Sequence, residues 1–214
     1  MLYDKLIFPK RTLTVILLSM LSMGFLSVTA ARKKPVQKIK VACIGNSITY
    51  GTGIQDREHF SYPVQLQKML GDKYLVGNFG KPGATLLNHG HRPYMQQEEY
   101  RQAMAFKGDI AVIHLGINDT DPRNWPNYRD EFVKDYLSLM DSLRSANPKV
   151  RFILACMTPI AHRHPRFISG TKQWHDEIQE AIKVVARVSG AELIDFHAPL
   201  YPYPNLLPDA IHPN

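Results

Sequence analysis

Ser47 follows an apolar run at residues 41–44 through the tight turn Gly45-Asn46. A buried strand that ends in such a turn places a hydroxyl at the carboxyl edge of a sheet, where α/β folds usually carry their chemistry. A serine hydroxyl held there is a candidate nucleophile. A turn serine also commonly caps the following helix, so this motif alone leaves both interpretations open.

Polar residues also follow the other predicted strands. Gly83 lies in the turn 78–85, Asn118 lies in the turn 116–119, and the terminal loop contains Asp209 and His212. In a parallel sheet these segments emerge at one edge. Serine hydrolysis requires a nucleophile, a histidine that accepts its proton, a carboxylate that orients the histidine, and donors for the oxyanion. Each requirement has a candidate at this edge.

The spacing of these residues suits the chemistry. Asp209 and His212 are three residues apart, so a single turn can bring the carboxylate to Nδ1 and leave Nε2 facing the serine. A glycine at position 83 lets a backbone N–H approach a substrate closely. The amide of Ser47, at the start of a turn or helix, is a third candidate donor for the oxyanion.

These four segments resemble the sequence blocks of the SGNH hydrolases, also called GDSL esterases, and they occur in that family's order. The resemblance implies that Ser47 is the nucleophile and that Asp209 and His212 complete a catalytic triad. It also implies that the Gly83 N–H and the Asn118 side chain donate to the oxyanion. The family usually has aspartate where this chain has Asn46, and asparagine can keep the turn and its hydrogen bond.

The resemblance also indicates a substrate class. Residues 45–51 and 78–85 are similar to those of bacterial sialate and xylan O-acetylesterases. This implies an exported serine ester hydrolase that removes short acyl groups, acetyl above all, from carbohydrates through an acyl-serine intermediate. Three alternatives stay open: a lysophospholipase or thioesterase, an O-acetyltransferase, and a carbohydrate-binding module whose catalytic site is inactive.

Strand and helix patterns alternate along the chain. Short apolar runs predict strands at residues 40–44, 74–79, 110–115, 152–155 and 192–196. Helical spacing predicts helices at residues 62–70, 96–106, 128–146 and 171–189. The strands are continuously apolar, as burial on both faces requires. We therefore expect an α/β protein with a flavodoxin-like three-layer α/β/α sandwich around a five-stranded parallel sheet, the fold that the resemblance also implies.

The first 30 residues have the layout of a signal peptide, with a basic start, an apolar middle and small residues near Ala30. Export is the expectation, to the periplasm or the medium, and membrane attachment follows only if the segment stays uncleaved. Cleavage removes three cations and one anion, which lowers the net charge from +7 to about +5. Much of the remainder lies in a basic lead-in at residues 31–39, so we expect no nucleic-acid partner.

Residues 40–214 are expected to form one hydrolase domain. Relatives in the family normally continue into a closing helix after the catalytic histidine. We therefore expect the sequence to be a piece of a longer protein, with one face of the sheet under-covered. His212 would then be loosely held near a fraying terminus.

The cysteines and the other histidines singled out in the sequence are expected to have structural rather than catalytic roles. Cys43 and Cys156 lie in separate predicted strands and are expected to be two buried thiols. The pairs His89/His91 and His162/His164 lie in loops without a completing ligand set, so neither metal nor cofactor is expected. His114 is expected to be a buried histidine that either has a structural role or supports the residues of the site.

Two aromatic residues, Tyr94 and Trp125, lie in loops that follow strand ends. They are candidates for a wall against a sugar ring or an acyl group, with local loop packing as the alternative.

Overall fold

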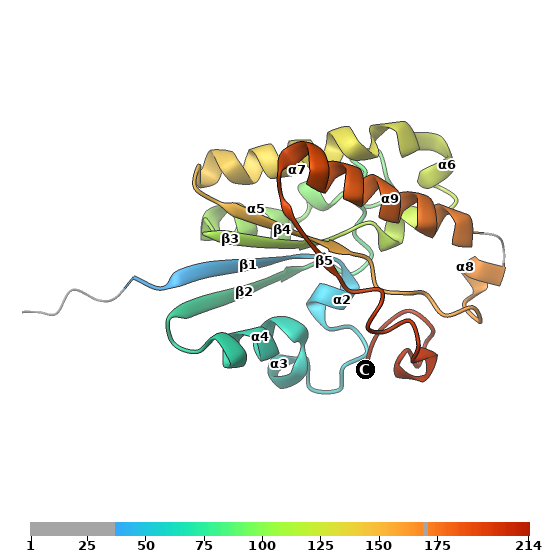
Figure 1. Cartoon of the computed structure of the whole chain (residues 1–214), viewed down its shortest axis with the longest axis horizontal. Coiled ribbons are helices and arrows are strands. Elements are labelled where there is room, and N and C mark those ends of the chain that lie inside the picture. The colour runs from blue at the N-terminus through green and yellow to red at the C-terminus, as the bar shows by residue number, and fades with distance from the viewer. Residues whose placement is uncertain (1–36, 169–170) are drawn as a thin grey trace, which may run out of the picture. The chain divides into compact units, whose positions relative to one another are not determined.

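Five parallel strands form a sheet with the order β2-β1-β3-β4-β5 in the computed structural model of this chain (Figure 1). This is the order of flavodoxin-like folds, so the predicted fold class is confirmed. The structure describes residues 37–168 and 171–214, and the predicted leader and most of the basic lead-in lie outside them. The strands are β1 (Ile39–Gly45), β2 (Tyr74–Gly80), β3 (Ile110–His114), β4 (Arg151–Cys156) and β5 (Glu192–Asp195).

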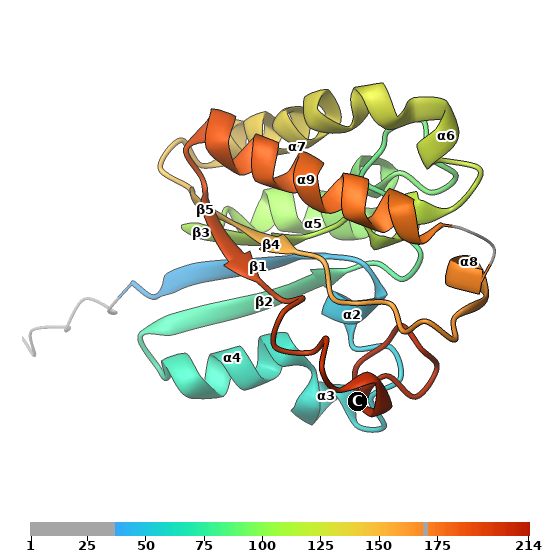
Figure 2. The same ribbon diagram turned by 45° about the vertical axis from the view of Figure 1, so that its right-hand side comes forward.

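Three helices cover one face of the sheet and form the larger part of the core (Figures 1 and 2). They are α5 (Glu98–Phe106), α7 (Phe132–Ala146) and α9 (Lys172–Ser189). In α9 the fully buried residues Ile178, Ile182 and Val185 recur at helical spacing, so one apolar stripe faces the sheet. Alternate residues of β1 and β3, such as Ile44 and Ile113, meet these helices.

The other face is covered less completely. Helices α3 (Arg57–Phe60) and α4 (Tyr62–Leu70) lie on this side (Figure 1), and α4 packs on β2. Beside α4 runs an apolar groove of about 760 Å³, whose lining includes Ile110, Ile153 and Ile194 from β3, β4 and β5. Within the residues that the structure describes, part of this face is therefore left open.

Several short helices differ from the sequence expectation. The predicted helix 128–146 is divided into α6 (Trp125–Tyr128), a 3-10 turn at Arg129–Glu131, and α7. The break lies at Tyr128, whose φ of −132° leaves the helical region. Likewise, extended backbone at Gln97 separates a 3-10 turn at Tyr94–Gln96 from α5. The sequence pattern did not indicate α2 (Ser47–Tyr50), α3, or α8 (Pro165–Ile168).

The strand order also settles the state of the two cysteines. Strand β3 lies between β1 and β4, and Cys43 and Cys156 are both free and buried. Within the residues that the structure describes, no helix is long and apolar enough to cross a membrane.

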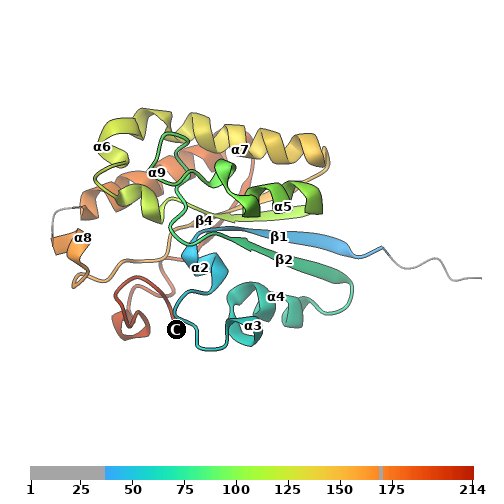
Figure 3. The same cartoon turned by 180° about the vertical axis from the view of Figure 1, so that it is seen from behind.

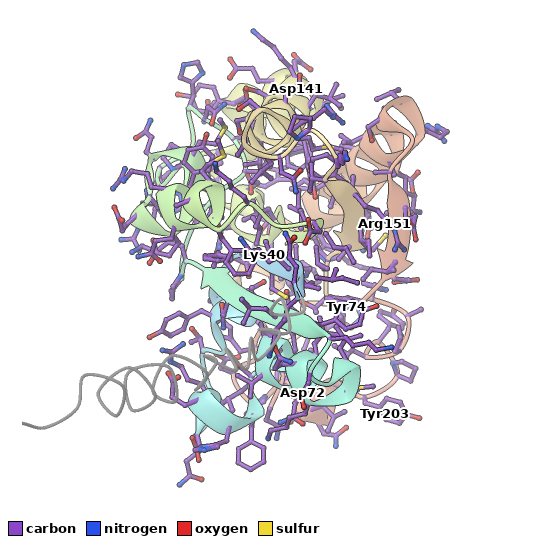
Figure 4. All side chains as sticks on the ribbon, turned by 90° about the vertical axis from the view of Figure 1, so that its left-hand side faces the viewer. Lys40, Asp72, Tyr74, Asp141, Arg151 and Tyr203 are labelled. Atoms are coloured by element: carbon purple, nitrogen blue, oxygen red, sulfur yellow. The ribbon has the colours of Figure 1, made fainter. Side chains whose placement is uncertain are left out.

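The two edges of the sheet differ in chemistry. Figure 4 looks toward the amino-terminal edge, where Lys40, Tyr74 and Arg151 mark the beginnings of β1, β2 and β4. The segments that were singled out for catalysis leave the sheet at the opposite edge.

Candidate active site

Ser47 is the first residue of α2, directly after β1. Asn46 caps this helix, since its Oδ1 accepts a hydrogen bond from the Ile48 N–H at 3.0 Å. The helix-cap role considered for Ser47 therefore belongs to Asn46, and asparagine supplies the hydrogen bond that the turn needs. The Asn46 side-chain NH₂ is buried and has no hydrogen-bond partner within the described residues.

The turn between β1 and α2 is unusually tight. A Cβ atom on Gly45 would lie 2.0 Å from Thr49 Oγ1 and 2.7 Å from the His114 carbonyl oxygen. Only glycine permits this approach, which sets α2 directly against the end of β1.

Asp209, His212 and Ser47 form a hydrogen-bonded chain across 165 residues of sequence. His212 Nδ1 lies 2.5 Å from Asp209 Oδ2, and His212 Nε2 lies 2.8 Å from Ser47 Oγ. Figures 2 and 3 show the C-terminal segment, in red, on the same side of the sheet as α2. The arrangement can pass a proton from the serine to the imidazole while the carboxylate fixes the ring's orientation.

Asp209 is held in the form that this role needs. Its partial burial raises the pKa, but this is outweighed by hydrogen bonds from the His212 ring and from the backbone N–H groups of His212 and Ile211. The net effect is a pKa below the ordinary value, so Asp209 is ionised at neutral pH. Its Oδ1 accepts those two backbone hydrogen bonds at 2.7 and 3.0 Å.

The terminal loop is anchored rather than loosely held, which corrects the expectation for His212. Leu207 and Ala210 are buried and form a small apolar cluster with Ala161. The Ala161 N–H donates to the Ala210 carbonyl at 2.8 Å. Arg163 donates to the carbonyls of Pro204 and Leu207. The loop after β4 thus holds the turn that carries Asp209 and His212.

The candidate oxyanion donors come from segments that follow three adjacent strands. The turn of Gly83 is tied to the end of β1, since the Lys81 N–H donates to the Gly45 carbonyl at 2.9 Å. It is tied to Asn118 as well, because Asn118 Nδ2 donates to the Ala84 carbonyl at 3.0 Å. An amide NH₂ has two donors, which leaves one for an oxyanion. The Ser47 N–H, at the first position of α2, has no acceptor within that helix.

The family-model comparison decides the family. Residues 43–214 match the model of the GDSL-like lipase/acylhydrolase family. The chain belongs to this family. The match includes Ser47, Gly83, Asn118, Asp209 and His212.

One curated relative is similar to this chain over most of this chain's length. The chain is 42% identical over 193 residues to an acetylxylan esterase from Xylanibacter ruminicola, covering 82% of this chain but only 40% of that protein. The chain thus spans about two fifths of its curated relative's length.

Two solved structures have the same fold. One is Est24, a carbohydrate acetylesterase from Sinorhizobium meliloti, with a TM-score of 0.55 and 19% identity over 74% of this chain and 84% of that one. The other is a GDSL-like lipase from Bacteroides thetaiotaomicron, with a TM-score of 0.59 and 21% identity over 82% of this chain and 80% of that one.

Gly83 offers a direct test of the oxyanion turn. Its φ is +76°, and a Cβ would lie 3.2 Å from Arg92 Nη1. Gly83→Ala is expected to lower kcat about tenfold, because the N–H must shift away from the developing charge. It should also cost about 1 kcal/mol of stability from backbone strain. Steady-state kinetics and urea unfolding measure the two effects.

Gly71→Ala is the matched control. Gly71 has nearly the same φ, +72°, and a Cβ added there would meet nothing within 4 Å. It lies between α4 and β2, at the other edge of the sheet. This variant should lose at least as much stability, because the ψ of Gly71, −165°, lies in a region that is essentially restricted to glycine, and it should keep its kcat. An equal kcat loss in both variants would show that strain alone, rather than the position of the Gly83 N–H, lowers activity.

The two aromatic candidates for a substrate wall lie in the protein interior. Tyr94 is fully buried and its hydroxyl donates to the Phe79 carbonyl at 2.8 Å. Trp125 is 3% exposed, and its indole N–H donates to Glu177 at 2.6 Å. Both side chains pack the loops from within, so the expectation that they contact substrate is wrong.

The two residues of the pair His89/His91 contact other side chains. His89 Nδ1 lies 2.7 Å from Glu131 Oε2, and the His91 ring pairs with Asn124. Within the described part of the chain, no three His, Cys, Asp or Glu residues are grouped so that they could hold a metal ion.

His114 is fully buried beneath the site, as expected of a structural histidine. Its Nε2 accepts a hydrogen bond from the Thr158 N–H at 3.2 Å, while Nδ1 has no partner within the described residues. Burial, followed by repulsion from His175, lowers the pKa of His114 to about 4. The neutral ring is therefore the form that the fold stabilises.

This depressed pKa predicts an acid-sensitive contribution to stability. The unfolded chain binds the His114 proton more tightly than the folded chain, so the contribution is complete above about pH 6.5 and is lost as the pH falls toward 4. The stability difference between wild type and His114→Gln should shrink by up to about 3 kcal/mol over that window. Urea unfolding at pH 7.5 and 4.5 measures it.

Wild type must be compared with the His114 variant because Asp119 has the opposite effect on how stability changes with pH. Burial raises the pKa of Asp119 to about 7, so its contribution to stability is greatest at low pH and is lost as the pH rises toward 7. Both proteins contain Asp119, and its contribution cancels in the difference. Stability curves that run parallel for the two proteins would contradict the prediction for His114.

Proposed function

We propose that this chain is an exported serine ester hydrolase that removes acetyl and other short acyl groups from carbohydrates. The hydrogen-bonded chain from Asp209 through His212 to Ser47 carries the proposal, since it is the arrangement that activates a serine. The 42% identity to an acetylxylan esterase supports acetylated carbohydrate as the substrate class.

The first step forms an acyl-enzyme. His212 Nε2 takes the proton from Ser47 Oγ as this oxygen attacks the ester carbonyl carbon. The carbonyl electrons move to its oxygen, where the N–H groups of Ser47, Gly83 and Asn118 stabilise the charge. The tetrahedral intermediate then collapses, the bond to the sugar oxygen breaks, and this oxygen takes the proton from His212.

The second step releases the acid. Water gives a proton to His212 and attacks the acyl-serine carbon, and collapse of this intermediate returns the proton to Ser47. In an acyltransferase a sugar hydroxyl would replace that water. The apolar groove beside α4 is lined by Ile48 and Pro213, which adjoin Ser47 and His212 in the sequence, but by none of the three triad residues themselves.

A panel of esters tests the proposal on the full chain. We expect kcat/KM to be highest for p-nitrophenyl acetate and to fall along the series to the decanoate, with acetate released from acetylated xylan or acetylated sialic acid. A maximum at long chains would favour a lysophospholipase or thioesterase. Acetyl transfer to added sugar with little free acetate would favour an acyltransferase. Glycan binding without hydrolysis would favour a binding module, and each of these results would overturn the proposal.

Export is tested separately. Expression of the full chain in a bacterial host should place the protein outside the cytoplasm, with a new N-terminus at or next to Ala31. An intact N-terminus in the membrane fraction would instead indicate an uncleaved anchor. Protein that stays in the cytoplasm would contradict export.

A further inference from the structure

Asp119 is a buried carboxylate for which the sequence comparison implied no role. It lies next to Asn118 in the 3-10 turn Ile117–Thr120 that follows β3, and its side chain is fully buried. Its Oδ2 accepts the Leu86 N–H and its Oδ1 accepts the Leu87 N–H, both at 2.9 Å. Both oxygens are therefore bonded to a segment more than 30 residues earlier in the chain.

The segment that Asp119 holds is the continuation of the oxyanion turn. Leu86 and Leu87 follow Gly83 by three and four residues. Asn118 donates a hydrogen bond to the carbonyl of Ala84, the residue directly after Gly83. Two consecutive residues after β3 thus make three hydrogen bonds to one short segment after β2. One of these segments carries the Gly83 N–H and the other carries the Asn118 amide.

Burial of a carboxylate is costly, and the raised pKa of Asp119 reflects that cost. An apolar side chain at position 119 would fill the same space without the cost of burying a charge. A second buried carboxylate, Asp135 on α7, accepts a hydrogen bond at 2.7 Å from the N–H of Asn88, the next residue after the segment that Asp119 holds. Its partner Asn88 lies farther from Gly83 than Leu86 and Leu87 do, and Asp135 is not adjacent to a candidate oxyanion donor, so it serves as a natural comparison.

We propose that Asp119 is a positioning residue that locks the segment 84–87 against Asn118 and so aligns the Gly83 and Asn118 donors on one oxyanion. This inference rests on the proposed serine ester hydrolase function. A displacement of about 1 Å in a catalytic group can cost about 100-fold in rate. Donors that must stabilise a charge are effective only when they are already oriented.

Asp119→Asn tests the proposal with little change of shape. Asparagine has one acceptor oxygen, so one of the two backbone N–H groups then faces an NH₂ group. We expect kcat for p-nitrophenyl acetate to fall about 10- to 100-fold while KM changes less than about threefold. The affinity for a boronic acid that forms a tetrahedral adduct on Ser47 should weaken by a similar factor, because the adduct's oxygen occupies the oxyanion position.

Asp135→Asn is the matched control. It also removes the charge of a buried carboxylate that holds the loop after β2, but asparagine keeps the one acceptor that the Asn88 N–H needs, so its kcat should stay within about threefold of wild type. Rates are normalised to active sites titrated with a serine-directed phosphonate. If Asp119→Asn does not fold, Asp119→Ser, which keeps one small acceptor, takes its place in the same comparison.

The outcomes separate this inference from the proposed function. Equal kcat losses in the Asp119 and Asp135 variants, or a raised KM with unchanged kcat, would overturn the positioning role while the wild type still hydrolyses esters. Unchanged boronic acid affinity in the Asp119 variant would overturn it too. A wild-type protein without Ser47-dependent hydrolysis would instead overturn the proposed function itself.

Discussion

Ser47→Ala is expected to lower kcat for p-nitrophenyl acetate by at least about 10⁴-fold, because no other group can form the acyl intermediate. The variant should fold normally. The Ser47 hydroxyl bonds to the His212 ring, and loss of one such hydrogen bond costs only about 1 kcal/mol. Steady-state kinetics and a thermal melt measure the two quantities, and labelling by a serine-directed phosphonate should disappear.

Ser142→Ala controls for the loss of a serine hydroxyl as such. The Ser142 hydroxyl donates to the Leu139 carbonyl within α7, away from the site. This variant should keep wild-type kcat and wild-type labelling. Hydrolysis at full rate by the Ser47 variant would show that another residue, or another protein in the preparation, carries the activity.

Asp209→Asn is expected to lower kcat by about 10² to 10⁴-fold. A carboxylate accepts the Nδ1–H of His212 and leaves Nε2 free to take the serine proton. Asparagine can instead donate to Nδ1, which favours the wrong tautomer of the ring. Because Asn keeps an oxygen for the backbone N–H groups of Ile211 and His212, the turn itself should persist. KM should change little, since the substrate does not depend on this carboxylate for binding.

Asp195→Asn is the matched control for the turn. Asp195 Oδ1 accepts hydrogen bonds from the His197 and Ala198 N–H groups at 2.7 and 3.0 Å, which reproduces the geometry around Asp209 Oδ1. The control variant should show wild-type kcat. If both substitutions reduced kcat alike, the loss would come from altered loops rather than from the orientation of His212.

The layout of the fold could be predicted because its signals are local. All five strands and the four longer helices follow from apolar periodicity and from stop signals such as Gly190 after α9. The short helix α2 could not be predicted, because four residues show no period. It depends on the Asn46 cap and on close packing against Gly45.

The candidate site was identified from residue types that follow strand ends, and the structure brings Asp209, His212 and Ser47 into contact. The prediction failed for Tyr94 and Trp125 because aromatic residues in loops have the same sequence pattern whether they face solvent or the core. Only packing decides which way such a side chain points. The hydroxyl of Tyr94 and the indole of Trp125 found partners inside the protein.

Local sequence was sufficient to specify the parallel sheet and the edge at which chemistry collects, because hydrophobic periodicity and turn residues act over a few positions. Three features became evident only in the tertiary structure. They are the order of the strands, the anchoring of the terminal loop by Ala161 and Leu207, and the hydrogen bonds of Asp119 to Leu86 and Leu87. Each depends on contacts between residues tens of positions apart. The free energy of such contacts depends on burial and on the geometry of the partner, and neither is determined by the residues beside them in the sequence.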